Sequence, residues 1–377
     1  MRIGFDVRPF LREETGVGVY LRNLLTGLAR LDHLNEYFLF SSSLKERFPR
    51  EKVPAFARTT FRDTRLPVKA VNFFWYEFGW PPLDSFFKTN LDLTHSATPL
   101  LIPTRGKKMI TVHDLFFWDY PEESNPEARK YFRKKIERTL AKADGIIAVS
   151  RYTNEALREK FDIPDGRIRT IYEGLDPFFL QEIPLDTVEC LRKRYSLPSE
   201  FILFVGALEP RKNLGALLKA LKLVQASHEK LPLVIAGPRA KDEARLNAQI
   251  ARDRLEPWVR FLGYVPKREL MTLYRLASVF VFPSLCEGFG IPLLEAMAGG
   301  LPVAASGVSA LPEIGGEAAL YFDPKSPEDM ADKIIRLLQD TQLRQELIDK
   351  GKKRVLDFDW TKTASETLNY YEDVLRA

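Results

Sequence analysis

The feature of this sequence that most constrains its fold is the regular alternation of short apolar runs with longer stretches of helical period. β-Branched or aromatic runs predict strands, and apolar residues at every third or fourth position predict helices. Strands that alternate with helices predict parallel sheets covered on both faces. The alternation lapses over residues 176–200 and then restarts. A chain of 377 residues can form two cores, so two doubly wound, Rossmann-like α/β domains are expected.

The predicted elements fall into two series, with the domain boundary in the lapse between them. In the first series the strands are Arg2–Val7, Leu91–Thr94, Met109–Val112, Gly145–Val149 and Ile168–Tyr172, and the helices are Val17–Leu31 and Tyr152–Phe161. In the second the strands are Phe201–Val205, Leu233–Ala236, Val259–Leu262, Val279–Phe282, Val303–Ala305 and Ala319–Phe322, and the helices are Asn213–Val224, Leu270–Ala277, Pro292–Ala298, Glu328–Val355 with one break, and Thr361–Leu375. The expected domains span residues 1–180 and 196–355. Ligands are expected at the carboxyl ends of the strands, in a cleft between the domains.

Composition and charge narrow the classes of function. A hydrophobic content of 45% and a charged content of 28% are typical of a globular protein. The net charge of +5 is spread along the chain, so no nucleic-acid partner is expected. Cys190 and Cys286 form neither a zinc spacing nor a disulfide framework, which favours a reducing, cytoplasmic compartment. The N-terminus lacks the apolar region of a signal peptide, and no apolar run approaches the ~20 residues of a membrane-spanning helix.

The segment Cys286–Gly300 carries the strongest functional signal. It places Glu287 in a glycine-bearing loop and Glu295 about one turn into the following helix, with Pro292 in the first turn. Backbone N–H groups at such a helix start form an anion site. Neither glutamate has a basic neighbour in the sequence, so both could accept hydrogen bonds from sugar hydroxyls, each worth ~1.5–3 kcal/mol. Alternatively, Glu295 only complements the helix dipole and Glu287 is solvated.

A second motif, Phe204–Leu214, predicts a diphosphate site. A strand ends in Gly206, and Arg211 and Lys212 precede a helix for which Asn213 is the expected N-cap. An arginine fork and a lysine point charge beside a helix N-terminus suit a diphosphate. The alternative is a solvated basic turn.

Two weaker motifs follow strands of the first series. Thr15–Tyr20 contains Gly-x-Gly, but Leu21 occupies the third glycine position, so the segment is not a dinucleotide fingerprint. It could still let a phosphate or substrate approach closely, or it could be only a tight strand–helix turn. The strand Met109–Val112 leads into His113 and Asp114, which places His113 at the rim of the expected cleft or, alternatively, in the core.

Two segments could contact a membrane. Arg129–Lys142 holds seven basic residues and one acid, with Tyr131, Phe132, Ile136 and Leu140 expected on one face. Such a helix could lie on an anionic bilayer, although a solvated face is the alternative. Phe61–Trp80 is unusually aromatic and could be its companion wedge or part of the core.

Together these motifs resemble the retaining glycosyltransferases of family 4, which have two Rossmann-like domains in the GT-B arrangement. The resemblance covers nearly the whole chain. Its most specific element is the pair Glu287 and Glu295 within Pro-Ser-Leu-Cys-Glu-Gly-Phe-Gly-Ile-Pro-Leu-Leu-Glu-Ala-Met, and Glu-Pro-Arg-Lys-Asn, His-Asp and Phe-Asp-Trp-Thr also match. The resemblance implies that residues 1–180 bind the acceptor and 196–355 the donor, and that the closing helix 361–377 crosses back to the first domain.

The resemblance also implies a role for each site residue. Glu295 would hold the donor ribose, Glu287 the hydroxyls of the sugar, and His113 would lie near the reacting sugar. Catalysis would depend on His113, Glu287, Arg211 and Lys212. The other donor-binding residues would meet the base, the sugar and the diphosphate: Gly16, Gly206, Tyr264, Val265, Gly288, Phe289, Gly290, Ile291 and Leu293.

The implied reaction is transfer of a hexose with retention of configuration. Glu-Pro-Arg-Lys-Asn with His-Asp-Leu resembles the mannosyltransferase branch, so GDP-mannose is the expected donor, and UDP-glucose or a UDP-N-acetylhexosamine is the alternative. The leaving diphosphate can accept the proton of the acceptor, so no metal or other cofactor is expected. Helix capping explains Asp357-Phe-Asp359. The expected acceptor is a glycan or a lipid-linked glycan, with the enzyme in the cytoplasm or peripheral on the cytoplasmic face of the membrane.

Two departures and two rival functions qualify this interpretation. Ala207 stands where many members carry arginine, so neutralisation of the diphosphate should depend more on Arg211, and Cys286 stands where an aromatic residue is frequent. A phosphorylase or nucleotide-sugar epimerase on a related fold is one rival, although no lysine has the context of a pyridoxal phosphate Schiff base. A non-catalytic nucleotide-sugar-binding protein is the other, and the intact pair Glu287 and Glu295 argues against it.

Overall fold

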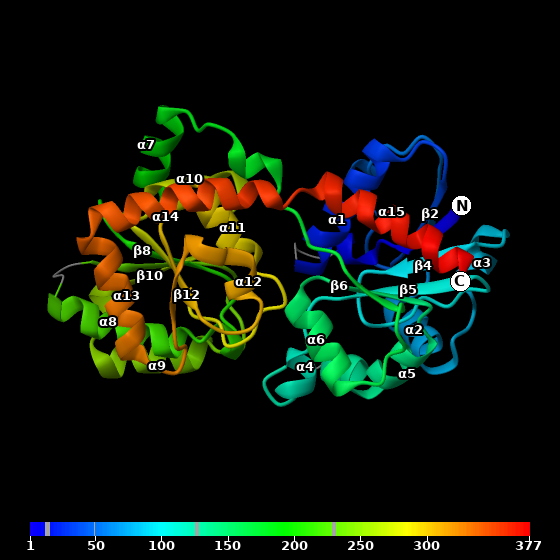
Figure 1. Ribbon diagram of the computed structural model, residues 1–377, viewed down its shortest axis with the longest axis horizontal. Coiled ribbons are helices and arrows are strands. Elements are labelled where there is room, and N and C mark those ends of the chain that lie inside the picture. The colour runs from blue at the N-terminus through cyan, green and yellow to red at the C-terminus, as the bar shows by residue number, and fades with distance from the viewer. Residues whose placement is uncertain (12–15, 49, 125–127, 228–230) are drawn as a thin grey trace. The chain divides into compact units, whose positions relative to one another are not determined.

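The computed structural model describes residues 1–377 except 12–15, 49, 125–127 and 228–230, and the chain divides into two compact units (Figure 1). Unit 1 comprises Met1–Gly174 and Asp359–Ala377, and unit 2 comprises Leu175–Phe358. The chain therefore changes unit after Gly174 rather than at the expected residue 180. The reason is local, because the Leu175 N–H donates to the Phe358 carbonyl (3.0 Å) inside unit 2.

Unit 1 contains a parallel sheet of seven strands in the order β3-β2-β1-β4-β5-β6-β7. The strands are β1 (Arg2–Asp6), β2 (Glu36–Ser42), β3 (Thr59–Thr64), β4 (Leu93–Ser96), β5 (Lys107–Val112), β6 (Gly145–Ala148) and β7 (Ile168–Thr170). The sequence predicted all of these except β2 and β3. Strand β3 is polar because it forms the edge of the sheet, and the short apolar run of β2 has no periodicity that separates a strand from a helix.

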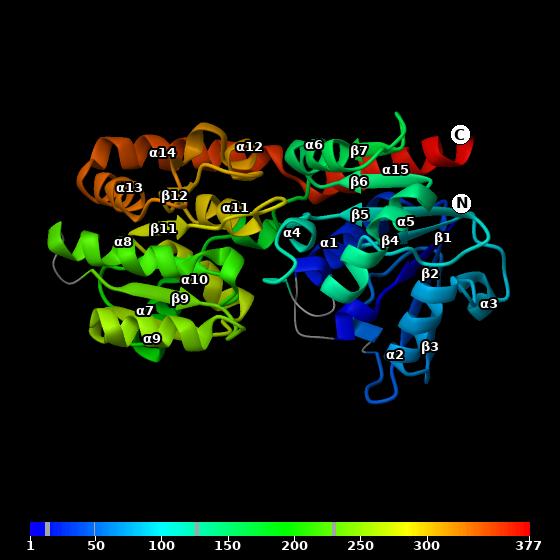
Figure 2. The ribbon, with the colours of Figure 1, turned by 90° about the horizontal axis from the view of Figure 1, so that it is seen from below.

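The helices of unit 1 cover both faces of this sheet (Figures 1 and 2). They are α1 (Gly16–Leu31), α2 (Val68–Phe73), α3 (Leu83–Phe87), α4 (Phe116–Asp119), α5 (Lys134–Lys142), α6 (Arg151–Lys160) and α15 (Trp360–Arg376), with single turns η1 (Arg8–Leu11), η2 (Arg50–Lys52), η3 (Phe74–Phe78) and η4 (Ala128–Arg133). The closing helix α15 lies beside α1, and a Cβ on Gly27 would come within 2.8 Å of the Ala364 Cβ. Ser150 caps α6 as predicted, since its side chain accepts from the Thr153 N–H.

Unit 2 contains a second parallel sheet, of six strands in the order β10-β9-β8-β11-β12-β13. The strands are β8 (Ile202–Val205), β9 (Leu233–Ala236), β10 (Val259–Gly263), β11 (Val279–Phe282), β12 (Val303–Ser306) and β13 (Leu320–Phe322). All six were predicted, and the central ones read as continuous apolar runs because both of their faces are buried.

Helices also cover both faces of the second sheet. They are α7 (Leu185–Arg194), α8 (Leu214–Ser227), α9 (Glu243–Asp253), α10 (Lys267–Leu276), α11 (Ile291–Ala298), α12 (Leu311–Gly315), α13 (Pro327–Gln339) and α14 (Thr341–Arg354), with turns η5 (Pro177–Leu180), η6 (Pro210–Lys212), η7 (Glu256–Trp258), η8 (Gly316–Ala318) and η9 (Val355–Asp357). The segment 176–200, expected as a linker, belongs to this unit. Its helix α7 contacts α10, and the rings of Phe179 and Tyr274 lie 6.1 Å apart.

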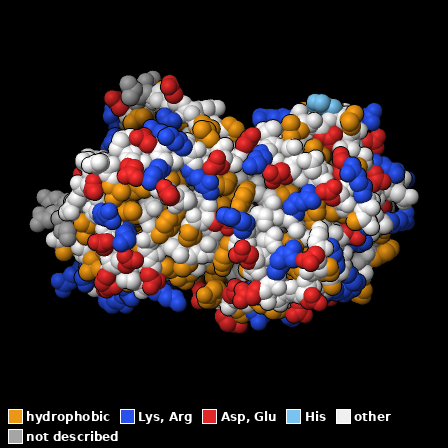
Figure 3. Space-filling view, viewed as in Figure 1, with side chains coloured by type: hydrophobic (Ala, Val, Ile, Leu, Met, Phe, Trp, Pro, Cys, Tyr) orange, Lys and Arg blue, Asp and Glu red, His pale blue; other side chains and the backbone are white. Residues whose placement is uncertain are grey.

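The surface carries charges of both signs. Lys and Arg side chains alternate with Asp and Glu side chains over the face shown in Figure 3, which agrees with the mild net charge. Among the described residues, no helix is both long enough and apolar enough to cross a bilayer.

Candidate active site

The order of strands in unit 2 reverses between β8 and β11, which places a ligand site there. The chain proceeds from β8 outward to β9 and β10, and then returns to β11 on the other side of β8. In open α/β sheets, ligands bind at the carboxyl ends of the strands at such a point. Gly206, Arg211 and Lys212 follow β8, and Glu287 follows β11. The structure thus brings four of the predicted site residues to one edge of the sheet.

Glu287 lies between the two cations of the predicted diphosphate turn. Lys212 Nζ donates to Glu287 Oε1 (2.6 Å), and Arg211 donates from its terminal nitrogen to Oε2 (3.0 Å). Arg211 also donates through Nε to Glu209 (2.9 Å). The Glu287 N–H in turn donates to Ser309 Oγ (3.0 Å). The interpretation of Glu287 as a carboxylate without a basic partner is therefore wrong, because its partners lie 75 and 76 residues away in the sequence.

The electrostatics of this cluster keep Glu287 ionised. Burial alone would raise the pKa of Glu287, but Lys212 and Arg211 overcome that effect and lower it to about 2. Burial, reinforced by the charge of Arg211, lowers the pKa of Lys212, and Glu287 opposes this shift. Glu287 thus holds two positive charges side by side in a site where only 8% of the Lys212 side chain is exposed. Two adjacent cations are suited to a dianionic ligand.

Asn213 does not cap helix α8 as the sequence predicted. Its backbone is left-handed, with φ of 55°. Its side-chain amide instead donates to the carbonyls of Pro283 (3.1 Å) and Pro324 (2.8 Å). The amide therefore ties the turn that carries Arg211 and Lys212 to the loop that follows β11.

Helix α11 begins as predicted, beside the Glu287 loop. Gly290 adopts a φ of 106° just before the helix, Pro292 lies in the first turn, and Gly299 and Gly300 end the helix. Pro292 lacks an N–H, and the Leu293 N–H donates to the Gly290 carbonyl (3.0 Å). The remaining N–H groups of a first turn have no partner within the helix. These groups, together with the positive end of the helix dipole, favour an anion at this position.

Glu295 lies one turn further along α11, in a different electrostatic environment. The Tyr274 hydroxyl donates to Glu295 Oε2 (2.8 Å). Burial raises the pKa of Glu295 to about 7, and the hydrogen bond from Tyr274 and the charge of Lys267 only partly oppose this shift. Near neutral pH, Glu287 is therefore fully ionised whereas Glu295 titrates.

We expect the stability of the protein to report this titration. Because the pKa of Glu295 in the folded protein (about 7) lies above the ordinary value of 4.5, the folded state binds more protons than the unfolded state between these values. The stability contributed by this group therefore falls as pH rises through that window. Glu295→Gln removes the titration, so its Tm relative to wild type should increase by several degrees from pH ~5 to pH ~7.5. A Tm difference that does not change with pH would contradict the assigned pKa.

The remaining predicted donor residues line the same edge of the sheet or the start of α11. Tyr264 is 56% exposed in the loop after β10, whereas Val265 beside it is buried. The Tyr264 ring, like Pro266 in the same loop, is thus accessible to solvent. Phe289 is also buried and contacts the ring of Phe358 edge-on at 5.6 Å. Leu293 is fully buried, so only its backbone could serve a ligand.

In unit 1, His113 lies at the carboxyl end of β5 with an acidic partner that the sequence interpretation missed. His113 Nδ1 lies 2.9 Å from Glu173 Oε1, and Nε2 lies 3.1 Å from the Ala97 carbonyl oxygen. Both ring nitrogens therefore face acceptors, an arrangement that is fully satisfied when both are protonated. Burial alone would lower the pKa of His113, but the bond to Glu173 and its charge raise it above the usual value. Glu173 follows β7, and an acid directly after a predicted strand was the signal for it.

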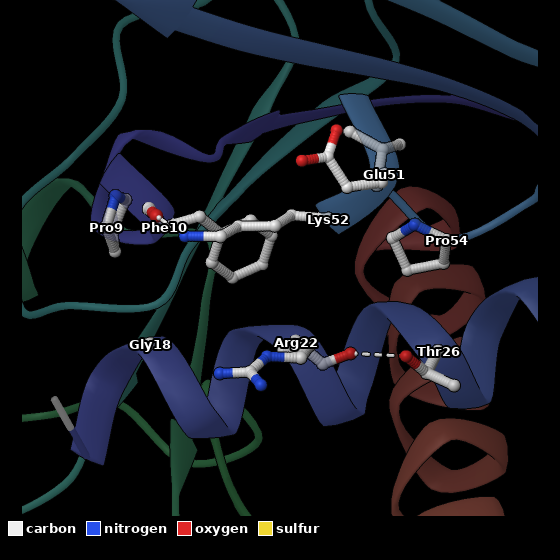
Figure 4. A pocket seen from close by; sticks show the side chains of 9 residues that line it. Pro9, Phe10, Gly18, Arg22, Thr26, Glu51, Lys52 and Pro54 are labelled. Carbon is white, nitrogen blue, oxygen red and sulfur yellow. Dashed lines mark hydrogen bonds between the residues drawn. The ribbon is translucent and has the colours of Figure 1, made fainter. Parts of the chain in front are cut away.

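The glycines of the Thr15–Tyr20 motif lie at the start of α1, although Thr15 itself is outside the described residues. Gly16 is exposed, and a Cβ built on it would meet no atom within 4 Å. Gly18 is buried and borders a pocket of about 320 Å³ between α1 and η2. Figure 4 shows Arg22 and Thr26 of α1 on one side of this pocket, with Pro9 and Phe10 and then Glu51, Lys52 and Pro54 on the other.

The variant Gly16→Ala distinguishes an effect on protein stability from an effect on ligand binding at this position. Because the added methyl group meets no protein atom, Tm should stay within about a degree of wild type or rise slightly with helix propensity. If a diphosphate approaches Gly16 as the family resemblance implies, kcat/KM should fall about tenfold or more. Thermal unfolding and steady-state kinetics on one preparation measure both quantities. Unchanged kinetics would remove Gly16 from the donor site.

The acidic pair Asp357 and Asp359 has a structural explanation. Asp359 is the N-cap of α15 and accepts from the Thr361 N–H (3.0 Å), which confirms the predicted capping role. Asp357 pairs with Arg354 (2.8 Å). Elsewhere in the described part of the chain, no group of three or more His, Cys, Asp or Glu side chains could hold a metal ion.

The two units match known families. Residues 15–178 match glycosyltransferase family 4, and residues 192–354 match the glycosyl transferases group 1. The chain belongs to these glycosyltransferases. The family resemblance read from the Glu287 and Glu295 segment is thereby confirmed.

Curated relatives of this glycosyltransferase include two proteins named mannosyltransferases. The chain is 29% identical over 384 residues to the O-antigen chain mannosyltransferase B of Escherichia coli, covering 99% of this chain and 100% of the relative. It is 30% identical over 257 residues to the serotype-specific mannosyltransferase WbdA of the same species, covering 67% of this chain and 31% of that longer relative.

Solved structures share the fold of the glycosyltransferase over its whole length. Sucrose-phosphate synthase from Thermosynechococcus elongatus superposes with a TM-score of 0.77 at 22% identity, covering 100% of this chain and 99% of that chain. Anabaena HepE in complex with UDP and glucose superposes with a TM-score of 0.76 at 19% identity, covering 99% and 100%. The predicted fold class, two doubly wound domains of GT-B type, is confirmed.

Proposed function

We propose that this glycosyltransferase transfers mannose from GDP-mannose to a glycan acceptor, with retention of the anomeric configuration. The observation that carries the proposal is the pair of cations, Arg211 and Lys212, that Glu287 holds at the switch point beside the start of α11. This arrangement suits a sugar diphosphate. The choice of mannose is supported by the mannosyltransferase that covers the whole chain at 29% identity.

In the proposed reaction, the protein binds the donor and stabilises charge, and the diphosphate of the donor accepts the proton. Arg211, Lys212 and the first turn of α11 bind the diphosphate and stabilise the charge that develops as the bond from C1 of the sugar to the phosphate oxygen breaks. Glu287 accepts a hydrogen bond from a hydroxyl of the sugar, and Glu295 accepts from the ribose. The acceptor oxygen bonds to C1 on the face that the diphosphate leaves, and its proton passes to a diphosphate oxygen. That geometry retains configuration without a protein nucleophile.

His113 has an electrostatic role in this proposal. With Glu173 at Nδ1 and the Ala97 carbonyl at Nε2, the imidazole is proposed to carry a positive charge, since both nitrogens can then donate, and it is not positioned to act as a base. Its charge would favour the sugar with its leaving diphosphate. Glu173 is then the positioning residue that keeps the ring oriented and charged.

Charge neutralisation by arginine and lysine makes a metal ion unnecessary in this proposal. Transfer should therefore persist in EDTA at the rate seen without it. A loss of more than half of the activity in EDTA that Mg²⁺ or Mn²⁺ restores would replace this part of the proposal with a metal-dependent one.

The acceptor is proposed to bind unit 1. The pocket beside Gly18 has the size of small-molecule sites and combines an apolar side, formed by Pro9, Phe10 and Pro54, with Arg22 and Glu51. Such a mixture suits the apolar faces and the hydroxyls of a sugar. The relative that covers the whole chain is named an O-antigen chain mannosyltransferase, so the proposed acceptor is a growing, mannose-containing glycan, carried on a lipid.

The decisive experiment tests donor and stereochemistry together. The purified protein is screened by thermal shift against GDP-mannose, UDP-glucose and UDP-N-acetylhexosamines, since stabilisation scales with ligand concentration over Kd. Transfer to a synthetic mannoside is then followed by NMR of the new anomeric centre. GDP-mannose alone should stabilise and transfer, giving an α-linked product. Preference for a UDP sugar would overturn the donor, a β-linked product would overturn retention, and binding without transfer or hydrolysis would favour a non-catalytic protein.

A further inference from the structure

Unit 1 exposes a compact group of aromatic rings outside the candidate active site. Phe73, Phe74, Phe78 and Trp80 follow α2 through η3, and each is at least 43% exposed, with Phe78 and Trp80 above 60%. The first three rings contact one another at centroid distances of 5.6–6.0 Å. Trp75 in the same turn points inward and joins the core. The segment 73–80 thus packs Trp75 and Tyr76 against the core and exposes four other rings, which is uncommon on a monomeric soluble surface.

Helix α5 presents a row of cations beside this aromatic turn. Lys135, Arg138 and Lys142 are spaced by three and four residues and so share one face. Lys135 donates to Glu77 of η3 (2.5 Å). The predicted apolar face of this segment does not face outward, because Ile136, Leu140 and Phe132 pack into the core. The exposed apolar surface therefore comes from η3 and the charge from α5.

A pocket of about 230 Å³ lies where the two surfaces meet. Leu100, Leu101 and Pro103 give it an apolar lining next to Phe78, while Lys108, Arg138 and Lys142 bring positive charge to it. Lys108 is near the start of β5, and His113 follows the end of that strand. Five residues along a strand span roughly 16 Å, so the pocket is distinct from the candidate active site.

We propose that η3 and α5 form a peripheral membrane-binding surface for an anionic phospholipid bilayer. The phosphate of a lipid head group occupies the pocket among Lys108, Arg138 and Lys142. The rings of Phe78 and Trp80 enter the interface between head groups and acyl chains, where aromatic side chains are favoured. A nucleic acid is a poorer candidate, because it would need a longer row of basic residues. A small soluble anion is also a poorer candidate, because it would not contact the four exposed rings. The surface goes beyond the transfer reaction, and it would keep the enzyme near a lipid-linked acceptor.

Flotation of the full chain with phosphatidylcholine vesicles, with and without phosphatidylglycerol, tests the proposal. Wild type should float with the anionic vesicles and much less with the neutral ones, and raised salt should weaken the binding. Each basic residue near an anionic surface contributes about fivefold in partition, so Arg138→Glu with Lys142→Glu should lower partition by more than tenfold. Phe78→Ser with Trp80→Ser should lower it at every salt concentration, because that contribution is not electrostatic.

Matched controls keep the test specific. Leu34→Ser removes a side chain of unit 1 that is 83% exposed, and Lys362→Glu reverses an exposed charge on α15, and neither should change flotation. Thermal stabilisation by GDP should be the same in all variants, which separates this surface from the donor site. Equal flotation with neutral and anionic vesicles, or wild-type flotation of both double variants, would overturn the proposal. So would a dimer in solution that Phe78→Ser with Trp80→Ser dissociates, since the rings would then meet a second copy.

Discussion

Glu287→Gln should abolish most of the transferase activity without loss of nucleotide binding. The carboxylate is proposed to accept a hydrogen bond from the sugar in the transition state, a contribution of ~1.5–3 kcal/mol that corresponds to about 10- to 150-fold in kcat/KM. In the protein without ligand, Arg211 and Lys212 are paired with Glu287. The diphosphate of GDP carries negative charge of its own and can pair with the same two cations. The Kd of GDP should therefore stay equal or fall. Steady-state kinetics with GDP-mannose and calorimetric titration with GDP measure the two quantities.

Glu209→Gln is the matched control for this substitution. It removes a carboxylate that also bonds to Arg211 (2.9 Å) but that is more exposed and does not contact Lys212. Exposed ion pairs contribute little, so kcat/KM should stay within about twofold of wild type. Turnover of Glu287→Gln near that of Glu209→Gln would show that Glu287 does not serve the transition state.

Gly290→Ala should destabilise unit 2 and disable the proposed donor site together. Gly290 adopts a φ of 106°, which a residue with a Cβ reaches only with strain of about 1–3 kcal/mol. The new Cβ would also come within 2.8 Å of Leu311 Cδ2, so the side chain of Leu311 would have to move. The first turn of α11 would shift with it, and donor stabilisation of the protein should largely disappear. Thermal unfolding with and without GDP-mannose measures both effects.

Gly307→Ala provides the comparison within the same unit. A Cβ there would meet Phe322 and Tyr321 at 3.5 Å, which is ordinary contact, and no unusual φ is required. Its Tm should therefore remain close to wild type. A Tm of Gly290→Ala equal to that of Gly307→Ala would show that the loop accommodates the left-handed residue at no cost.

The sequence predicted the edge of the sheet at which the site residues lie, but not how they contact one another. Arg211 and Lys212 directly follow one apolar run and Glu287 another, so the rule for parallel sheets placed them together. The ion pairs join residues more than 70 positions apart, and their formation depends on β8 and β11 being neighbours, which periodicity does not reveal. The contact between His113 and Glu173 could not be predicted for the same reason, since it joins residues that follow two different strands.

Local motifs were predicted well where the backbone alone decides the outcome. Ser150 and Asp359 cap their helices, and Pro292 begins α11, because each role depends on neighbours within a few residues. Asn213 failed as a predicted cap for the opposite reason. Its side-chain amide donates to two carbonyls from loops distant in the sequence, and these tertiary hydrogen bonds outweigh the local preference of Asn for the N-cap position.

The path of the chain between the units has a consequence for synthesis. Unit 2 is one uninterrupted segment, whereas unit 1 is assembled from two pieces, and the second supplies α15, which lies against α1. On a ribosome, every residue of unit 2 is made before the piece that completes unit 1. The unit that begins first is therefore the one whose last segment is synthesised after all of unit 2. Until α15 is synthesised, the face of α1 around Gly27 and Tyr20 lacks the Ala364 and Trp360 contacts that cover it in the folded protein.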